Sequence, residues 1–186
     1  MKKNKPKFTT GFTLIELMVA VSVFSIVMVI CMGSILSVFD ANKKSQSLRA
    51  VMDNLNSAME GMTRAIRFGD TYHCGSTGSL SSPQDCPLGD QSLTLFSSSG
   101  TQITYKLSGS QIVKTIGGTD YPVTSSNIVI QSLVFRVFGS PPYSGGSDLY
   151  QPQVIIVVSG YAGSKPTDKS SFTLETTLSQ RKLDFQ

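Results

Sequence analysis

The sequence has few of the residues that carry acid–base and metal chemistry. It holds one histidine, His73, three cysteines and no tryptophan, and only 15% of its 186 residues are charged. The G-x-S-x-G, phosphate-loop and H-E-x-x-H patterns are all missing from it. Its serines and aspartates therefore have no evident base to form a catalytic group with. We expect the protein not to be an enzyme, and nothing in the sequence requires a cofactor.

Positive charge is also scarce beyond the first seven residues. The net charge is +4, and Lys2, Lys3, Lys5 and Lys7 supply four positive charges before the first acidic residue, Glu16. The remaining basic and acidic side chains balance. Because nucleic-acid binding needs a basic face on the folded domain, we expect no nucleic-acid partner.

A long apolar segment follows the lysines. Residues 17–39 contain no charge, and 18 of these 23 residues are apolar. A helix of that length extends ~35 Å, enough to cross a hydrocarbon core of ~30 Å. The lysines should remain in the cytoplasm, which places the rest of the chain outside it. A cleaved secretory signal is the alternative, although its apolar core has only ~7–15 residues and ends at a small-residue site.

Glu16 is unusual because a carboxylate near the start of a membrane helix is unfavourable unless it is paired or close to the interface. It stands in the sequence G-F-T-L-I-E-L, which begins at Gly11, behind the lysine-rich leader and before the apolar segment. This pattern, from residue 7 to about residue 39, resembles the signal of type IV prepilins and type II secretion pseudopilins.

The resemblance implies a role for each residue of the signal. A prepilin peptidase would cut after Gly11 and methylate the new amino terminus of Phe12. The carboxylate of Glu16 would pair with the Phe12 amine of a neighbouring subunit, which makes Glu16 an assembly residue. The implied partners are the peptidase, other pilin or pseudopilin subunits, the cytoplasmic membrane and assembly platform proteins.

The segment after the membrane span has the pattern of an amphipathic helix. Apolar residues recur at spacings of three and four, and Gly69 follows as a helix stop; the stripe is Leu48, Met52, Leu55, Met59, Met62 and Ile66, widened by Val51, Ala58 and Ala65. Packing on a sheet is the expected use of this stripe, and a coiled-coil seam is the alternative.

The chain from residue 70 onward has the composition of a β-rich domain. Only 15 of its 117 residues are charged, and Ser, Thr and β-branched residues dominate. Strands are predicted over 92–97, 102–107, 111–116, 127–138, 153–159 and 171–178, with the apolar segment at 153–159 as a central strand. The predicted fold is α+β and pilin-like, a long helix packed on a mostly antiparallel sheet. Its regions are 1–11 (leader), 12–39 (membrane and filament-core helix), 40–69 (helix continuation) and 70–186 (extracytoplasmic head).

Cys74 and Cys86 lie on either side of a Gly- and Ser-rich loop. Outside the cytoplasm we expect a disulfide between them, which Cys31 in the apolar segment cannot join. A zinc site with His73, Cys74 and Cys86 is the alternative, although a fourth ligand is not evident. Asp85 and Asp90 could bind Ca²⁺, as some pseudopilin heads do, but they have no regular ligand spacing.

The sequence therefore predicts a structural subunit of a type IV pilus or a type II secretion pseudopilus. Within the family, the succession of apolar strands is similar to that of minor pseudopilin J and of large minor pilins. A major or adhesive pilin is one alternative. A signal-anchored extracytoplasmic binding domain that never polymerises is another, although it gives no reason for Gly11 and Glu16.

Overall fold

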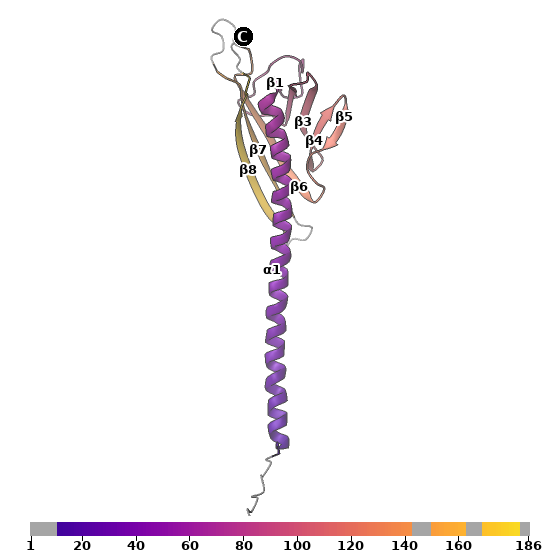
Figure 1. The fold of residues 1–186 in the computed structure, drawn as a ribbon, viewed down its shortest axis with the longest axis vertical. Coiled ribbons are helices and arrows are strands. Elements are labelled where there is room, and N and C mark those ends of the chain that lie inside the picture. Colours follow the sequence, from indigo (N-terminus) through magenta and orange to yellow (C-terminus); the bar gives the residue numbers. More distant parts are fainter. Residues whose placement is uncertain (1–10, 143–149, 163–168, 183–186) are drawn as a thin grey trace, which may run out of the picture. The chain divides into compact units, whose positions relative to one another are not determined.

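A computed structural model describes residues 11–142, 150–162 and 169–182. The four lysines of the expected leader, Lys2, Lys3, Lys5 and Lys7, lie outside the described residues. One helix, α1 (Leu14–Phe68), is followed along the described chain by eight strands (Figure 1). The chain divides into two units, residues 1–45 and 46–186, and the boundary falls inside α1.

The first unit is the N-terminal part of α1, and its apolar side chains are exposed. Across the described chain, α1 is the one helix that is long and apolar enough to span a membrane. The hydroxyls of Ser22, Ser25 and Ser34 donate hydrogen bonds to backbone carbonyls of the preceding turn. These polar side chains are therefore satisfied within the helix, so a lipid environment does not leave their donors unpaired.

In the second unit, one side of α1 is buried. The buried residues of the helix are Val51, Leu55, Ala58, Met59, Met62 and Ile66. The expected stripe is therefore confirmed over most of its length, but Met52 is 46% exposed. The buried face follows the 3.6-residue period of the helix through Val51 and Leu55. Met52 lies at the edge of that face and is therefore partly exposed.

The strands form two antiparallel sheets. The first has five strands in chain order, and the second has three, with the predicted central strand between its neighbours. The strands of the first sheet are β1 (Asp70–Cys74), β2 (Ser92–Phe96), β3 (Gln102–Ser108), β4 (Gln111–Ile116) and β5 (Thr119–Pro122). Those of the second are β6 (Ile128–Phe138), β7 (Gln153–Ala162) and β8 (Ser170–Ser179).

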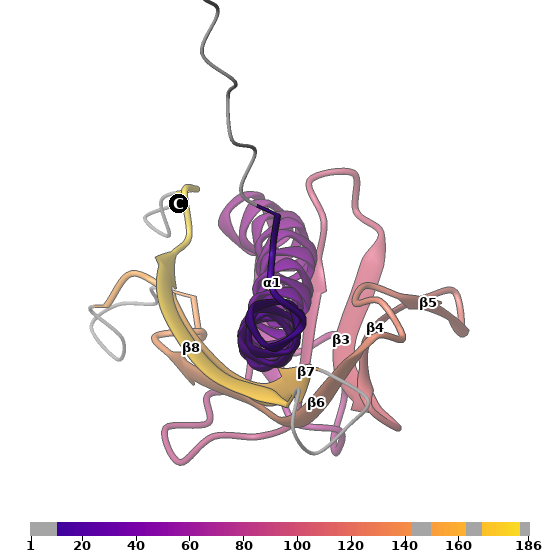
Figure 2. The ribbon, with the colours of Figure 1, turned by 90° about the horizontal axis from the view of Figure 1, so that it is seen from below.

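The α+β, pilin-like fold class is thus confirmed, and all six predicted strands are present. The sequence did not predict β1 or β5, and it predicted one sheet where the structure has two. Figure 2 shows β8 and the strands β3, β4 and β5 on opposite sides of the second unit's part of α1, with β6 and β7 between them. Buried residues from the second unit's part of α1 and from both sheets form one hydrophobic cluster.

Candidate functional site

The N-terminus of α1 is built by a local capping interaction. Thr13 precedes the helix, its carbonyl accepts the first helical hydrogen bond from Leu17, and its side-chain oxygen lies 3.4 Å from the backbone nitrogen of Glu16. Thr13 is therefore the N-cap residue, and Thr-x-x-Glu is the spacing of a capping box, of which the structure shows the threonine half. This capping by Thr13 was not predicted from the sequence, although the Thr-x-x-Glu spacing is its signal.

The residues on either side of the expected cleavage point lie outside the helix. Gly11 and Phe12 are exposed and precede Thr13, and a Cβ atom built on Gly11 would meet no atom within 4 Å. The Phe12 side chain is 81% exposed. A protease can therefore reach the Gly11 carbonyl without unwinding the helix.

Cleavage after Gly11 would place a new positive charge at the N-terminus of α1, which is the positive end of the helix dipole. The amine of Phe12 would stand one residue before the N-cap, where backbone N–H groups already carry partial positive charge. An anion offsets this charge, and Glu16 is the acidic residue of the first turn. In an apolar environment, such an amine and the Glu16 carboxylate would each be stabilised by pairing with an opposite charge.

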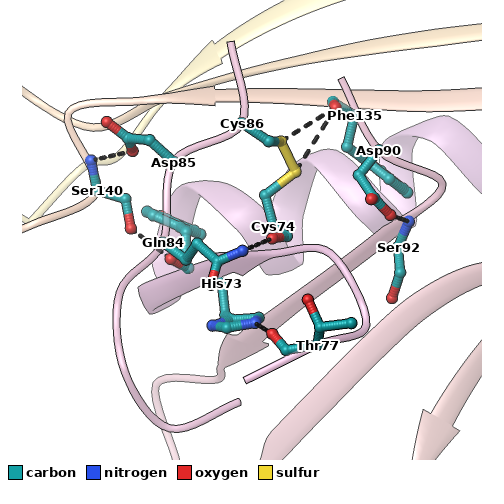
Figure 3. Close-up of a disulfide and its surroundings, with 11 residues drawn as sticks. His73, Cys74, Thr77, Gln84, Asp85, Cys86, Asp90, Ser92, Phe135 and Ser140 are labelled. Atoms are coloured by element: carbon teal, nitrogen blue, oxygen red, sulfur yellow. Dashed lines mark hydrogen bonds between the residues drawn. A yellow bond between two sulfur atoms is a disulfide. The ribbon is translucent and has the colours of Figure 1, made fainter. Parts of the chain in front are cut away.

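A second cluster of polar residues surrounds the disulfide between Cys74 and Cys86, whose Cα atoms are 5.7 Å apart (Figure 3). Cys74 is the last residue of β1 and is fully buried. The two sulfur atoms are bonded to each other and are therefore not free to ligate zinc. Among the described residues, no group of three or more His, Cys, Asp or Glu side chains could hold a metal ion.

His73 is the anchor of the loop between the two cysteines. Its side chain is fully buried, Nδ1 lies 2.8 Å from the carbonyl oxygen of Ser82, and Nε2 lies 2.9 Å from that of Thr77. Both ring nitrogens are thus occupied by the backbone of the loop. The ring has no accessible nitrogen with which to activate a substrate.

Asp85 and Asp90, on either side of Cys86, connect this part of the chain to β6 and to the segment that follows β6. The carboxylate of Asp85 accepts hydrogen bonds from the backbone N–H groups of Gly139 and Ser140, at 3.0 and 2.8 Å. Asp90 caps the backbone of Ser92, while its own backbone exchanges two hydrogen bonds with Phe135. The two carboxylates accept hydrogen bonds from different backbone segments, and this arrangement does not favour a Ca²⁺ site at Asp85 and Asp90.

The N-terminal segment of the chain matches a known protein-family model. The family model described as the prokaryotic N-terminal methylation motif matches residues 7–32. The match supports the type IV pilin and pseudopilin signal and indicates a precursor of that kind. It implies processing by a prepilin peptidase and assembly with other pilins, and together with the apolar helix it fits an inner-membrane anchor. No curated protein and no solved structure matches the chain.

Proposed function

We propose that the protein is a structural, non-enzymatic subunit of a type IV pilus or a type II secretion pseudopilus. The observation that carries this proposal is the matched signal in which exposed Gly11 and Phe12 directly precede a capped helix with Glu16 in its first turn. The exposed apolar side chains of residues 12–39 support it further, because such a surface requires lipid or neighbouring helices around it.

In the proposed sequence of events, the precursor enters the cytoplasmic membrane with its lysines inside and its β-rich head outside. Peptidase cleavage releases residues 1–11 and exposes the amine of Phe12, which is then methylated. Pairing of this amine with Glu16 of a neighbouring subunit sets the register between helices in the filament. The disulfide between Cys74 and Cys86 supports the extracytoplasmic placement of the head, because such bonds persist in oxidising compartments.

We further propose a minor-subunit role similar to that of pseudopilin J. The support is the resemblance in the succession of apolar strands, and the role predicts few copies per filament. A major pilin would instead account for most of the filament mass.

Mass spectrometry of filaments purified from the producing bacterium tests these proposals together. The expected chain begins at Phe12, carries one added methyl group and lacks two hydrogens because of the disulfide. Quantification against the most abundant subunit gives the copy number. An uncut chain that stays in the membrane and is missing from filaments would support the signal-anchored alternative and overturn the proposal.

A further inference from the structure

A groove in the second unit lies between the last turns of α1 and the five-stranded sheet. Helix α1 contributes Gly61, Arg64 and Phe68, and the sheet side contributes Ser98, Tyr105 and Lys114; the groove encloses about 360 Å³. Figure 2 shows β4 and β5 extending this sheet away from α1. We call this feature the α1–β4 groove.

Gly61 has no packing role within its own chain. It lies inside the helix, it is exposed, and a Cβ atom built on it would meet nothing within 4 Å. Glycine is less favourable than alanine in a helix interior. Gly69 is different, because a Cβ atom there would meet Leu95 Cδ1 at 2.7 Å. A molecule that approaches from outside can therefore come closer to the helix backbone at Gly61 than at a residue with a side chain.

Lys114 gives the groove its charge. In the sheet register it lies opposite Tyr105 on β3 and opposite Tyr121 on β5, so all three side chains share one face of the sheet. Lys114 is half-buried, and none of the salt bridges formed by the described residues includes it. A half-buried ammonium with aromatic neighbours favours a carboxylate partner, because the surrounding protein screens the pair less than water does.

The opposite wall adds a second cation and an apolar surface. Arg64 contacts Glu60 at 3.6 Å, but both side chains are 75% exposed, and an exposed pair of this kind is weak and exchangeable. Phe68 is 49% exposed, whereas Tyr105 is 2% exposed. The groove thus offers two cations, aromatic carbon and bare helix backbone to one ligand.

We propose that the α1–β4 groove binds an acidic segment of a neighbouring filament subunit, with a carboxylate at Lys114 and Arg64 and with close backbone approach at Gly61. The inference rests on the proposed function, because it takes its partner from the same filament. Charge complementarity selects the occupant, and the contact fixes the head of one subunit against the next.

Site-specific photo-crosslinking of the full-length chain in the producing bacterium tests this inference. A photoreactive amino acid replaces exposed Ser98, and filaments are irradiated and analysed by peptide mass spectrometry. We expect an adduct with an Asp- or Glu-containing segment of another pilin-type chain. Lys114→Glu should lower the adduct yield about tenfold, which corresponds to ~1.4 kcal/mol. Reversing the identified carboxylate to lysine should restore it.

Two further variants separate binding from folding. Gly61→Ala should raise the Tm, because it favours the helix, and still lower the adduct yield. Arg136→Glu, at an exposed cation on β6, is the matched control and should leave the yield unchanged. If neither Lys114→Glu nor Gly61→Ala changes the adduct yield, the inference is overturned. An adduct with polysaccharide alone would also overturn it.

The failure of this inference and the failure of the proposed function give different results. A chain that is cut after Gly11 and present in filaments, but forms no groove adduct with another subunit, overturns the groove proposal alone. A chain that remains uncut and outside the filaments overturns both.

Discussion

The hydroxyl of Tyr72 on β1 donates a hydrogen bond to the carbonyl oxygen of Ile66 in the last turn of α1, over 2.6 Å. The carbonyl oxygen of Gly69 lies 3.0 Å from the same hydroxyl. The last carbonyls of a helix have no donor within the helix, so a side chain of the first strand supplies one. Burial, and secondly the negative charge of Asp70, raise the pKa of Tyr72.

The buried tyrosines predict a loss of stability at alkaline pH. Burial raises the pKa of Tyr105 to about 12 from its ordinary value of 10. A raised pKa means that the folded state favours the neutral phenol. The resulting contribution of Tyr105 to the free energy of unfolding is complete below pH 10 and is lost as the pH rises through 12. We expect Tyr105→Phe to reduce the loss of stability over this range by about 2 kcal/mol.

Thermal unfolding of the detergent-solubilised full-length chain at pH 8, 10, 11 and 12, followed by circular dichroism, measures this effect. Tyr121→Phe is the matched control, because Tyr121 is 52% exposed. Equal alkaline losses in Tyr105→Phe and the unchanged protein would contradict the prediction.

Gly69, which follows the last residue of α1, is the basis of a second prediction about stability. A Cβ atom on Gly69 would meet Leu95 Cδ1 at 2.7 Å and the Phe96 carbonyl oxygen at 2.8 Å. The backbone oxygen cannot move aside easily, so Gly69→Ala should cost about 1–3 kcal/mol of the unfolding free energy. Gly61→Ala should instead add about 0.5–1 kcal/mol. Denaturant titration of both variants measures the two values, and shifts of the same sign would refute the distinction.

The disulfide between Cys74 and Cys86 predicts that the stability of the head depends on oxidation of these cysteines. It closes a loop with a sequence separation of 12, and the entropy of such a loop corresponds to about 3 kcal/mol. We expect the double variant Cys74→Ser, Cys86→Ser to lose that amount in denaturant unfolding. A reducing agent should lower the Tm of the unchanged protein but not that of the double variant. Cys31→Ser, at the free exposed cysteine, is the control. A reducing agent that leaves the Tm of the unchanged protein where it is would contradict the prediction.

Much of the fold could be predicted because its signals are periodic. The apolar stripe of α1 and the alternation in β3 and β8 record which residues face the core. The sequence of β1 lacks this alternation, since Tyr72, His73 and Cys74 are all buried. All four residues of β5 are exposed, and its signal was the preceding Gly117-Gly118 turn, where both residues have positive φ.

Of the two candidate binding regions, one could be predicted from the sequence and the other could not. The N-terminal signal could be predicted because its residues are consecutive and act through the sequence itself. The α1–β4 groove could not, because Gly61 and Lys114 meet only once the sheet has its register. The separation into two sheets was equally hidden, since pairing between distant strands has no local pattern.

Glu16 carries the last prediction, which concerns filament assembly. Thr13 caps the helix through the backbone N–H of Glu16 and not through its carboxylate. Glu16→Val therefore keeps that hydrogen bond, and it removes a charge whose burial in lipid costs ~2.5 kcal/mol or more. We expect the variant to insert in the membrane and to be cut after Gly11 as usual, but to be missing from filaments because the Phe12 amine of its neighbour has no anion. Immunoblots of membrane and filament fractions measure both steps, with Ser22→Ala as the control in the same helix. Normal amounts of Glu16→Val in filaments would show that the carboxylate is not the assembly contact.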